Sequence, residues 1–83
     1  MKKIYKYNIA IGDFEVEMQD CATILDVQVQ DGVPVMWALI DTNEKMIKRE
    51  FTIVGTGHDC QVAPKDYIGT FQMGMLVWHL FER

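Results

Sequence analysis

The densest group of chemically useful residues in the sequence is the segment Gly55-Thr56-Gly57-His58, which follows a predicted strand. Two glycines one residue apart can adopt positive φ angles and turn successive N–H groups toward an anion. Thr56 could add a hydroxyl and His58 a ring N–H. The segment matches neither the dinucleotide-binding G-x-G-x-x-G pattern nor a phosphate loop with its lysine. A tight, bulged exit from the strand is therefore the alternative interpretation.

Arg49 is the second candidate, because it falls on the same strand face as Phe51 and Ile53. A charge on an apolar face must be paired or must serve a ligand. Pairing inside the protein is the simpler interpretation. The more specific interpretation is that Arg49 binds a phosphate or carboxylate ligand, since a guanidinium binds both in bidentate geometry.

Aromatic rings at Trp37, Tyr67 and Trp78 could complete a ligand site by stacking on a base or ring. Such stacking is worth on the order of 1–3 kcal/mol per base. Trp37 lies in the apolar segment Val33–Asp41, where a core position is the simpler interpretation.

The remaining reactive residues indicate neither catalysis nor a metal or cofactor site. No serine or cysteine nucleophile accompanies His58 in a recognisable motif, and Glu15 and Glu17 are typical of the solvated face of an edge strand. His58 and Cys60 form one H-x-C pair that nothing obvious completes. Cys21 and Cys60 form no C-x-x-C, so we expect two reduced thiols. The sequence thus predicts a protein that is not an enzyme.

Length and charge limit the remaining function classes. The 83 residues suffice for one domain, residues 1–83, and a chain of this size is only marginally stable unless it dimerises. A net charge of −4 and the lack of basic runs beyond Lys2-Lys3 and Lys48-Arg49 argue against non-specific binding of nucleic acid. Because there is no long apolar run and no signal-peptide pattern, we expect no membrane span and a place in a cytoplasm.

Alternating apolar and polar residues predict an all-β fold of about six mostly antiparallel strands in hairpins, forming a small sandwich or a partly open barrel. The first two strands are expected to pair across Gly12-Asp13, and Asp31-Gly32 is the strongest hairpin signal. The third strand should turn Leu25, Val27 and Val29 inward. The predicted strand segments are Ile4–Ile11, Phe14–Met18, Thr23–Gln30, Val33–Asp41, Met46–Val54 and the C-terminal run Tyr67–Gln72 with Met75–Phe81.

The C-terminal run is interrupted by Gly74, which suggests a bulge, a bend or a close approach of the backbone. It continues with Met75–Phe81, which is apolar on both faces. A strand that is apolar on both faces must be covered on both. In so short a chain a second subunit could supply one cover, so we expect a homo-oligomer. The candidate interface residues are Met75, Leu76, Trp78 and Leu80.

Several segments together resemble a family of small proteins of phages and prophages. They are K-I-Y-K-Y (Lys3–Tyr7), V-Q-V-Q-D-G-V-P-V-M-W-A-L-I-D (Val27–Asp41), I-V-G-T-G-H (Ile53–His58), Y-I-G-T-F-Q (Tyr67–Gln72) and V-W-H-L-F-E (Val77–Glu82). The resemblance implies a phage-encoded protein in the cytoplasm of a bacterial host, and it supplies no catalytic residues.

Three functions remain open in that setting. The protein could bind and inhibit a bacterial host factor, such as a defence protein, through protein–protein contacts. It could instead be an oligomeric sponge for a small anionic ligand or nucleotide signal, or a structural or assembly protein of the phage. A sponge should bury Met75–Phe81 in a dimer and keep a pocket near Gly55–His58, whereas an inhibitor should expose a patch that contains tryptophan.

Overall fold

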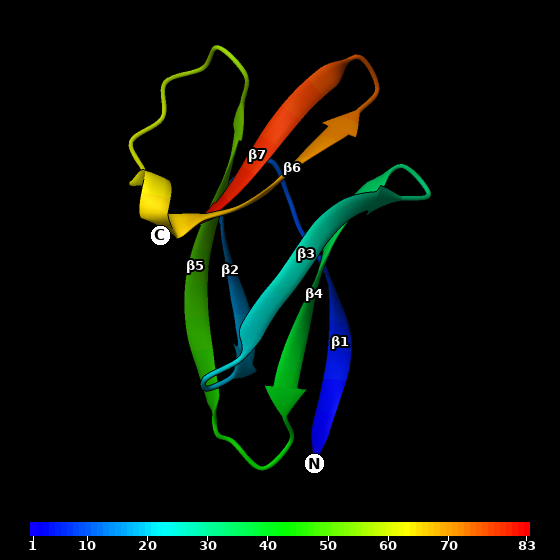
Figure 1. Ribbon diagram of the computed structural model, residues 1–83, viewed down its shortest axis with the longest axis vertical. Helices are drawn as coiled ribbons and strands as arrows, with labels where there is room; N and C mark the ends of the chain where they lie inside the picture. The colour runs from blue at the N-terminus through cyan, green and yellow to red at the C-terminus, as the bar shows by residue number, and fades with distance from the viewer.

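Two antiparallel sheets make up the fold, which a computed structural model describes for residues 1–83 (Figure 1). One sheet has the strand order β1-β4-β3, and the other has the order β2-β5-β7-β6. The sheets face each other as an open sandwich and do not close into a barrel, which confirms the all-β prediction. The fold has seven strands, where about six were predicted. The elements are β1 (Lys2–Asn8), β2 (Gly12–Gln19), β3 (Thr23–Gln30), β4 (Val33–Asp41), β5 (Met46–Gly55), the short 3-10 helix η1 (Pro64–Asp66), β6 (Tyr67–Met73) and β7 (Leu76–Glu82).

The predicted hairpin between the first two strands is wrong. β1 pairs with β4, and β2 pairs with β5, so the chain crosses from one sheet to the other between them. The buried Ile9 continues the β1 ladder, because its N–H donates to the carbonyl of Pro34 at 3.1 Å. Gly12 then adopts a φ of +89° as β2 begins in the other sheet. Crossing brings Tyr7 and Ile9 at the end of β1, and the apolar face of β2, against the core between the sheets.

Two hairpins connect neighbouring strands within the sheets. Asp31 and Gly32 both have positive φ, 52° and 77°, as a type I′ turn between β3 and β4 requires. The predicted hairpin at this position is confirmed. Gly74, with a φ of 63°, begins the turn between β6 and β7, so it ends a strand and does not bulge one.

A β-bulge in β3 changes which residues face the core. The pairing with β4 shifts between Ile24 and Asp26, so Leu25 is the extra residue of the strand. Leu25 is 48% exposed, although the alternating pattern placed it inward. Ile24 takes the inward position and packs against the core. A single inserted residue reverses the faces of every position before it, because strand side chains alternate.

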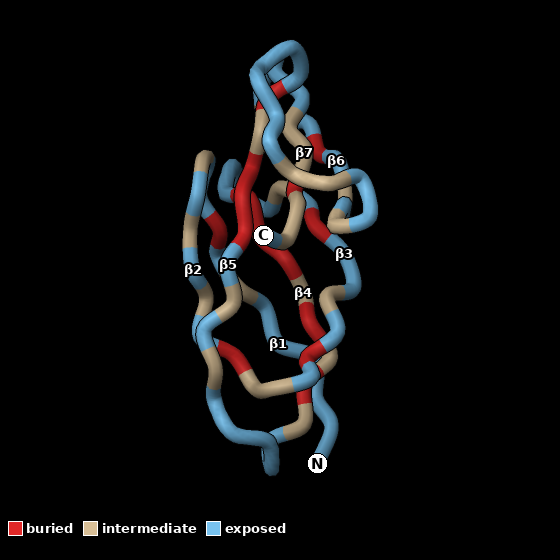
Figure 2. Tube along the Cα trace, turned by 90° about the vertical axis from the view of Figure 1, so that its left-hand side faces the viewer, coloured by how far each residue is buried: buried red, intermediate tan, exposed pale blue.

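The core lies between the two sheets, as the buried segments in Figure 2 show. Met18, Met36, Ile40, Phe51 and Leu80 are its most completely buried large side chains. The alternation predicted for the second strand is confirmed, because its apolar side chains face this core and its glutamates face solvent.

One side of the sandwich is closed, and the other is open. On the closed side, Gly69 of β6 lies under Val27 of β3. A Cβ on Gly69 would come within 2.7 Å of Val27 Cγ1, so this approach requires glycine. On the open side, β1 and β2 are the terminal strands of their sheets, and neither has a partner along its outer edge. The fold contains no helix long or apolar enough to cross a membrane.

Candidate functional site

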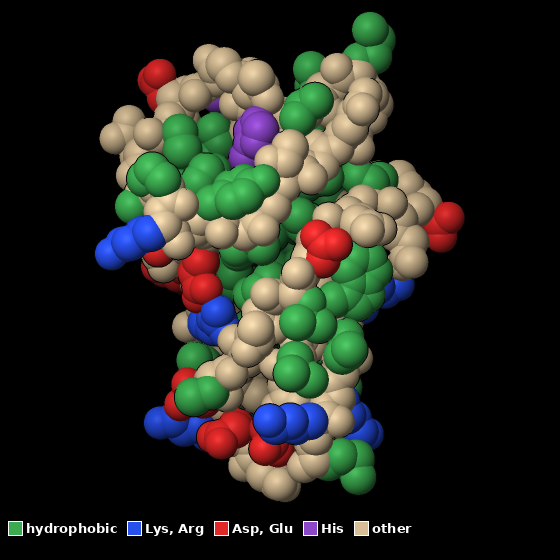
Figure 3. Space-filling view, viewed as in Figure 1, with side chains coloured by type: hydrophobic (Ala, Val, Ile, Leu, Met, Phe, Trp, Pro, Cys, Tyr) green, Lys and Arg blue, Asp and Glu red, His purple; other side chains and the backbone are tan.

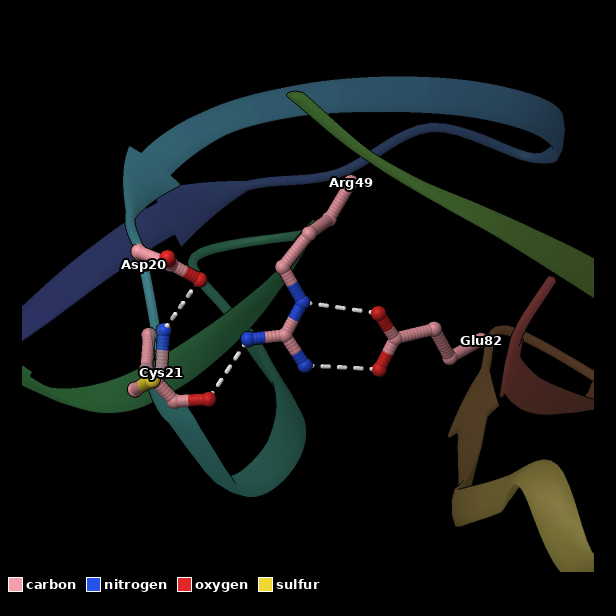
Figure 4. A network of polar contacts seen from close by, with 5 residues as sticks. Asp20, Cys21, Arg49 and Glu82 are labelled. Atoms are coloured by element: carbon pink, nitrogen blue, oxygen red, sulfur yellow. Dashed lines mark hydrogen bonds and ion pairs between the residues drawn. The ribbon is translucent and has the colours of Figure 1, made fainter. Parts of the chain in front are cut away.

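Arg49 forms a three-point contact that joins distant parts of the chain (Figure 4). Its Nε and Nη2 donate to the two carboxylate oxygens of Glu82 at 2.7 and 2.6 Å, and its Nη1 donates to the carbonyl of Ala22 at 2.5 Å. Hydrogen bonding to Glu82 raises the pKa of the Arg49 guanidinium. Arg49 is therefore paired within the protein, which was the simpler of its two interpretations.

The Gly55–His58 segment forms a tight turn at the exit of β5. The N–H of His58 donates to the carbonyl of Gly55 at 3.1 Å, and Gly57 has a φ of 86°. The N–H of Thr56 donates to the carbonyl of Val77 at 3.0 Å. Two of the amides expected to bind an anion are therefore already bonded to carbonyls.

The ring of His58 folds back over Gly55. A Cβ at Gly55 would lie 2.8 Å from two atoms of that ring, so the absence of a side chain makes room for it. The His58 ring also meets Trp78 edge to face, with 6.1 Å between the ring centroids. The histidine thus covers the end of the sandwich and does not point into a preformed anion site.

A polar chain on the outer face of β6 and β7, which also includes Thr56 just after β5, was not predicted from the sequence. His79 Nε2 lies 2.7 Å from Thr56 Oγ1, and His79 Nδ1 lies 3.0 Å from Thr70 Oγ1, which is 2.6 Å from the Tyr67 hydroxyl. When Thr56 gives its only hydroxyl proton to the carbonyl of Val77, 3.2 Å away, it accepts from Nε2. In a neutral ring Nδ1 then accepts from Thr70, and Tyr67 donates to Thr70.

The sequence indicates this series of hydrogen bonds only weakly, because the series depends on the register between strands. His79 shares one face of β7 with Val77 and Phe81, which the two-residue period of a strand does indicate. The pairing of Thr70 with His79 across β6 and β7 is set by tertiary structure alone.

The candidate ligand-binding residues do not converge on one cavity. Arg49 and Tyr67 line a surface depression of about 510 Å³ beside η1. Gly55, His58 and Trp78 line a different one of about 230 Å³. Trp37 borders neither. Across the whole chain, no group of three or more His, Cys, Asp or Glu side chains is arranged to hold a metal ion, and Cys21 and Cys60 are exposed free thiols.

Apolar side chains gather on the outer face of the three-stranded sheet, where Figure 3 shows green side chains over β3 and β4. Trp37 and Leu39 lie two residues apart on this face of β4, and Ile4 stands directly opposite Leu39 on β1. Ile4 is 61% exposed. The bulged Leu25 extends the group on β3. We call these four residues, Ile4, Leu25, Trp37 and Leu39, the Trp37 face. Trp37 is thus a half-buried residue of the outer face and not a member of the core between the sheets.

The predicted interface on β7 separates into exposed and buried residues. Met75 and Leu76, at the turn between β6 and β7, are 95% and 59% exposed. Trp78 is half-buried, and its Nε1 is enclosed without a hydrogen-bond partner in the protein. Leu80 is fully buried in the protein's own core, so its predicted place at an interface is wrong. One face of β7 is therefore covered by the three-stranded sheet of the same molecule.

Comparison with known proteins gives a family and no function. No curated protein and no solved structure shows significant similarity to the chain. A match to a family described as a domain of unknown function, DUF7352, covers residues 1–83. Because the match spans the whole sequence, the chain belongs to the DUF7352 family.

Proposed function

We propose that this protein is a binding protein that acts through protein–protein contacts made by the Trp37 face. The phage origin implied by the sequence resemblance makes a bacterial host factor the expected partner, and inhibition of that factor the expected effect. The observation that carries the proposal is an apolar group on an outer sheet face of a protein of only 83 residues, in which a half-buried Trp37 is accompanied by Ile4 and Leu25, 61% and 48% exposed.

The composition of the Trp37 face suits recognition of a protein. Tryptophan is enriched among the residues that dominate binding energy, and aliphatic neighbours exclude water around it. Polar residues border the group, since Lys6 and Asp26 flank Trp37 on the two neighbouring strands. An apolar centre with a polar rim is the usual anatomy of a protein interface.

The structure supports a small-ligand sponge less well. The two depressions at the Gly55–His58 turn, about 230 and 260 Å³, are each below the roughly 300–1,000 Å³ of typical ligand pockets. The larger depression contains Arg49 and Lys65, but also Glu82 and Asp66. The two donors that Arg49 would offer a phosphate in bidentate geometry are already bonded to Glu82.

The proposal is tested by affinity capture from a bacterial lysate, followed by titration of the purified partner. Wild type and Met75→Ala, altered at the exposed β6–β7 turn, should bind with equal affinity. Trp37→Ala should weaken binding by about 30-fold or more, as expected for a central tryptophan.

Leu25→Glu serves as the second variant, because Leu25 is 48% exposed and its replacement should leave the core intact. Circular dichroism should show the same fold for every variant. Equal binding by wild type, Trp37→Ala and Leu25→Glu would remove the Trp37 face from this role.

A further inference from the structure

The open side of the sandwich carries two unpaired strand edges, β1 and β2. The closed side is sealed where β3 packs onto β6, so the two free edges that remain lie together on the opposite side. β1 is solvated on both of its faces, with Ile4 61% and Tyr5 39% exposed. A long, exposed edge of this kind is a template for pairing with another strand.

Hydrogen bonds at the strand ends show which backbone groups of β1 are free. The carbonyl of Met1 accepts from Thr42 N–H at 2.8 Å, and Ile9 N–H donates to β4 at 3.1 Å. Met1 and Ile9 are both odd-numbered, and the register between β1 and β4 is continuous between them. The backbone groups of the odd-numbered residues of β1 therefore bond to β4. The N–H and C=O groups of Ile4 and Lys6 therefore point away from the sheet.

The same reasoning applies to β2. Asp20 N–H donates to the carbonyl of Lys45 at 2.8 Å, and the register with β5 is continuous, so even-numbered residues bond to β5. The backbone groups of Asp13, Glu15 and Glu17 point to the free edge.

The two edges carry opposite charge. β1 contains Lys2, Lys3 and Lys6, and the first twelve residues include no acidic side chain. β2 contains three acidic residues and no basic one, in a protein whose net charge is −4. Like charges oppose the pairing of either edge with its own copy, whereas β1 and β2 attract each other.

We propose that two copies of the protein associate through their open sides, each β1 pairing antiparallel with the β2 of the other copy. β1 and β2 run in opposite directions within one molecule (Figure 1). A two-fold axis parallel to the strands therefore places each β1 beside the β2 of the second copy with antiparallel direction. The perpendicular two-fold axis would pair lysines with lysines and glutamates with glutamates, so charge selects between the two dimers.

The side chains of the two edges also fall on matching faces. Lys6 lies beside Trp37 on the outer face of its sheet, and Glu15 and Glu17 lie exposed on the outer face of theirs. In an antiparallel register that places Lys2 opposite Glu17 of the second copy, Lys6 falls opposite Asp13 of that copy. The closed two-fold arrangement leaves no free edge on this side, and it stops at two copies without forming a fibre.

Sedimentation equilibrium with two charge-reversal variants tests this dimer independently of any host partner. Wild type should sediment at twice the chain mass of 9.6 kDa. Lys2→Glu/Lys6→Glu makes both edges acidic, and Glu15→Lys/Glu17→Lys makes both basic. Each variant alone should dimerise at least about 30-fold more weakly than wild type. An equimolar mixture of the two should recover the dimer, because each acidic edge then lies beside an edge whose net charge is positive.

Lys65→Glu/Lys45→Glu is the matched control for Lys2→Glu/Lys6→Glu, since it changes the net charge by the same amount but alters no residue of β1 or β2. It should dimerise like wild type. A monomeric wild type at 100 μM, or two reversal variants that dimerise as well as wild type, would overturn the proposal.

Amide hydrogen exchange, followed by NMR, gives a second test at single residues. In the wild-type dimer the amides of Ile4, Lys6, Glu15 and Glu17 should exchange slowly, and in either reversal variant alone they should exchange quickly. The Tyr5 amide, which faces β4, should be protected in both. A wild-type dimer in which the four edge amides still exchange quickly would show that another surface is used and would refute the edge pairing.

Discussion

Replacing Arg49 by methionine should weaken the fold substantially, because Arg49 ties the end of β7 to the β2–β3 connection. Methionine keeps most of the aliphatic stem but removes all three hydrogen bonds. Glu82 is then left without its cation, and the carbonyl of Ala22 without its donor. The Arg49 side chain is only 18% exposed and that of Glu82 32%, so solvent replaces these contacts incompletely.

The expected loss follows from that intermediate burial. Breaking a fully buried ion pair costs about 3–5 kcal/mol, and an exposed pair contributes about 1 kcal/mol at most. We therefore expect Arg49→Met to lower the free energy of unfolding by about 2–3 kcal/mol. A domain of this size has roughly 4–12 kcal/mol in total. Small domains have urea m-values of about 1 kcal/mol/M, so the midpoint should fall by about 2–3 M.

Urea unfolding followed by circular dichroism measures this loss, and Arg83→Met is the matched control. Arg83 contacts Asp13 at 3.3 Å, but the two side chains are 44% and 65% exposed, so its loss should cost no more than about 0.5 kcal/mol. In Arg49→Met/Glu82→Gln the uncompensated charge is gone, so this double variant should lose less than the sum of its single variants. Equal stability of Arg49→Met and Arg83→Met would refute the assigned role of Arg49.

Two further substitutions test the packing between the sheets. Gly69→Ala should cost about 1–3 kcal/mol, because the new Cβ would lie 2.7 Å from Val27 Cγ1, and Gly69→Ala/Val27→Ala should lose less than the two single changes added together in urea unfolding. Additive losses would show that the two residues do not clash. Tyr7→Phe should leave stability unchanged or raise it by up to about 1 kcal/mol, because the Tyr7 hydroxyl is buried without a protein partner. Burial raises the pKa of Tyr7, which means that the folded state disfavours its ionised form. The free energy of unfolding should therefore be unaffected by this group below about pH 10 and should fall as pH rises through the folded-state pKa. Urea unfolding at pH 7 and 10.5 should show a smaller alkaline loss for Tyr7→Phe, and equal losses would contradict this assignment.

The proposed dimer and the proposed partner surface use different parts of the same sheet. Dimer formation would occupy the free edge of β1, whereas Trp37 lies on the adjacent central strand β4. Ile4 belongs to the edge strand and also to the Trp37 face. A dimer would therefore place the two Trp37 faces on separate sheets, where each could receive its own partner.

Local patterns in the sequence were sufficient to predict the strands and the β3–β4 hairpin. Alternation in a half-buried strand reflects which side chains face the core, so most strand bounds follow from the order of the residues alone. The Asp31-Gly32 turn is also local, because both residues tolerate the positive φ that a type I′ turn needs. The position of Arg49 on an apolar face likewise predicted that it would need a partner.

Strand pairing and the choice of inner and outer faces were decided by the tertiary structure. β1 and β2 are joined by only three residues and still belong to different sheets, because each pairs along its full length with a distant strand, β1 with β4 and β2 with β5. β4 is apolar on both faces, so no alternation showed that Trp37 would face outward and Met36 inward. Leu25 faces outward through a bulge in β3. These outcomes depend on contacts between residues far apart in the chain, and a pattern read from neighbouring residues carries no information about them.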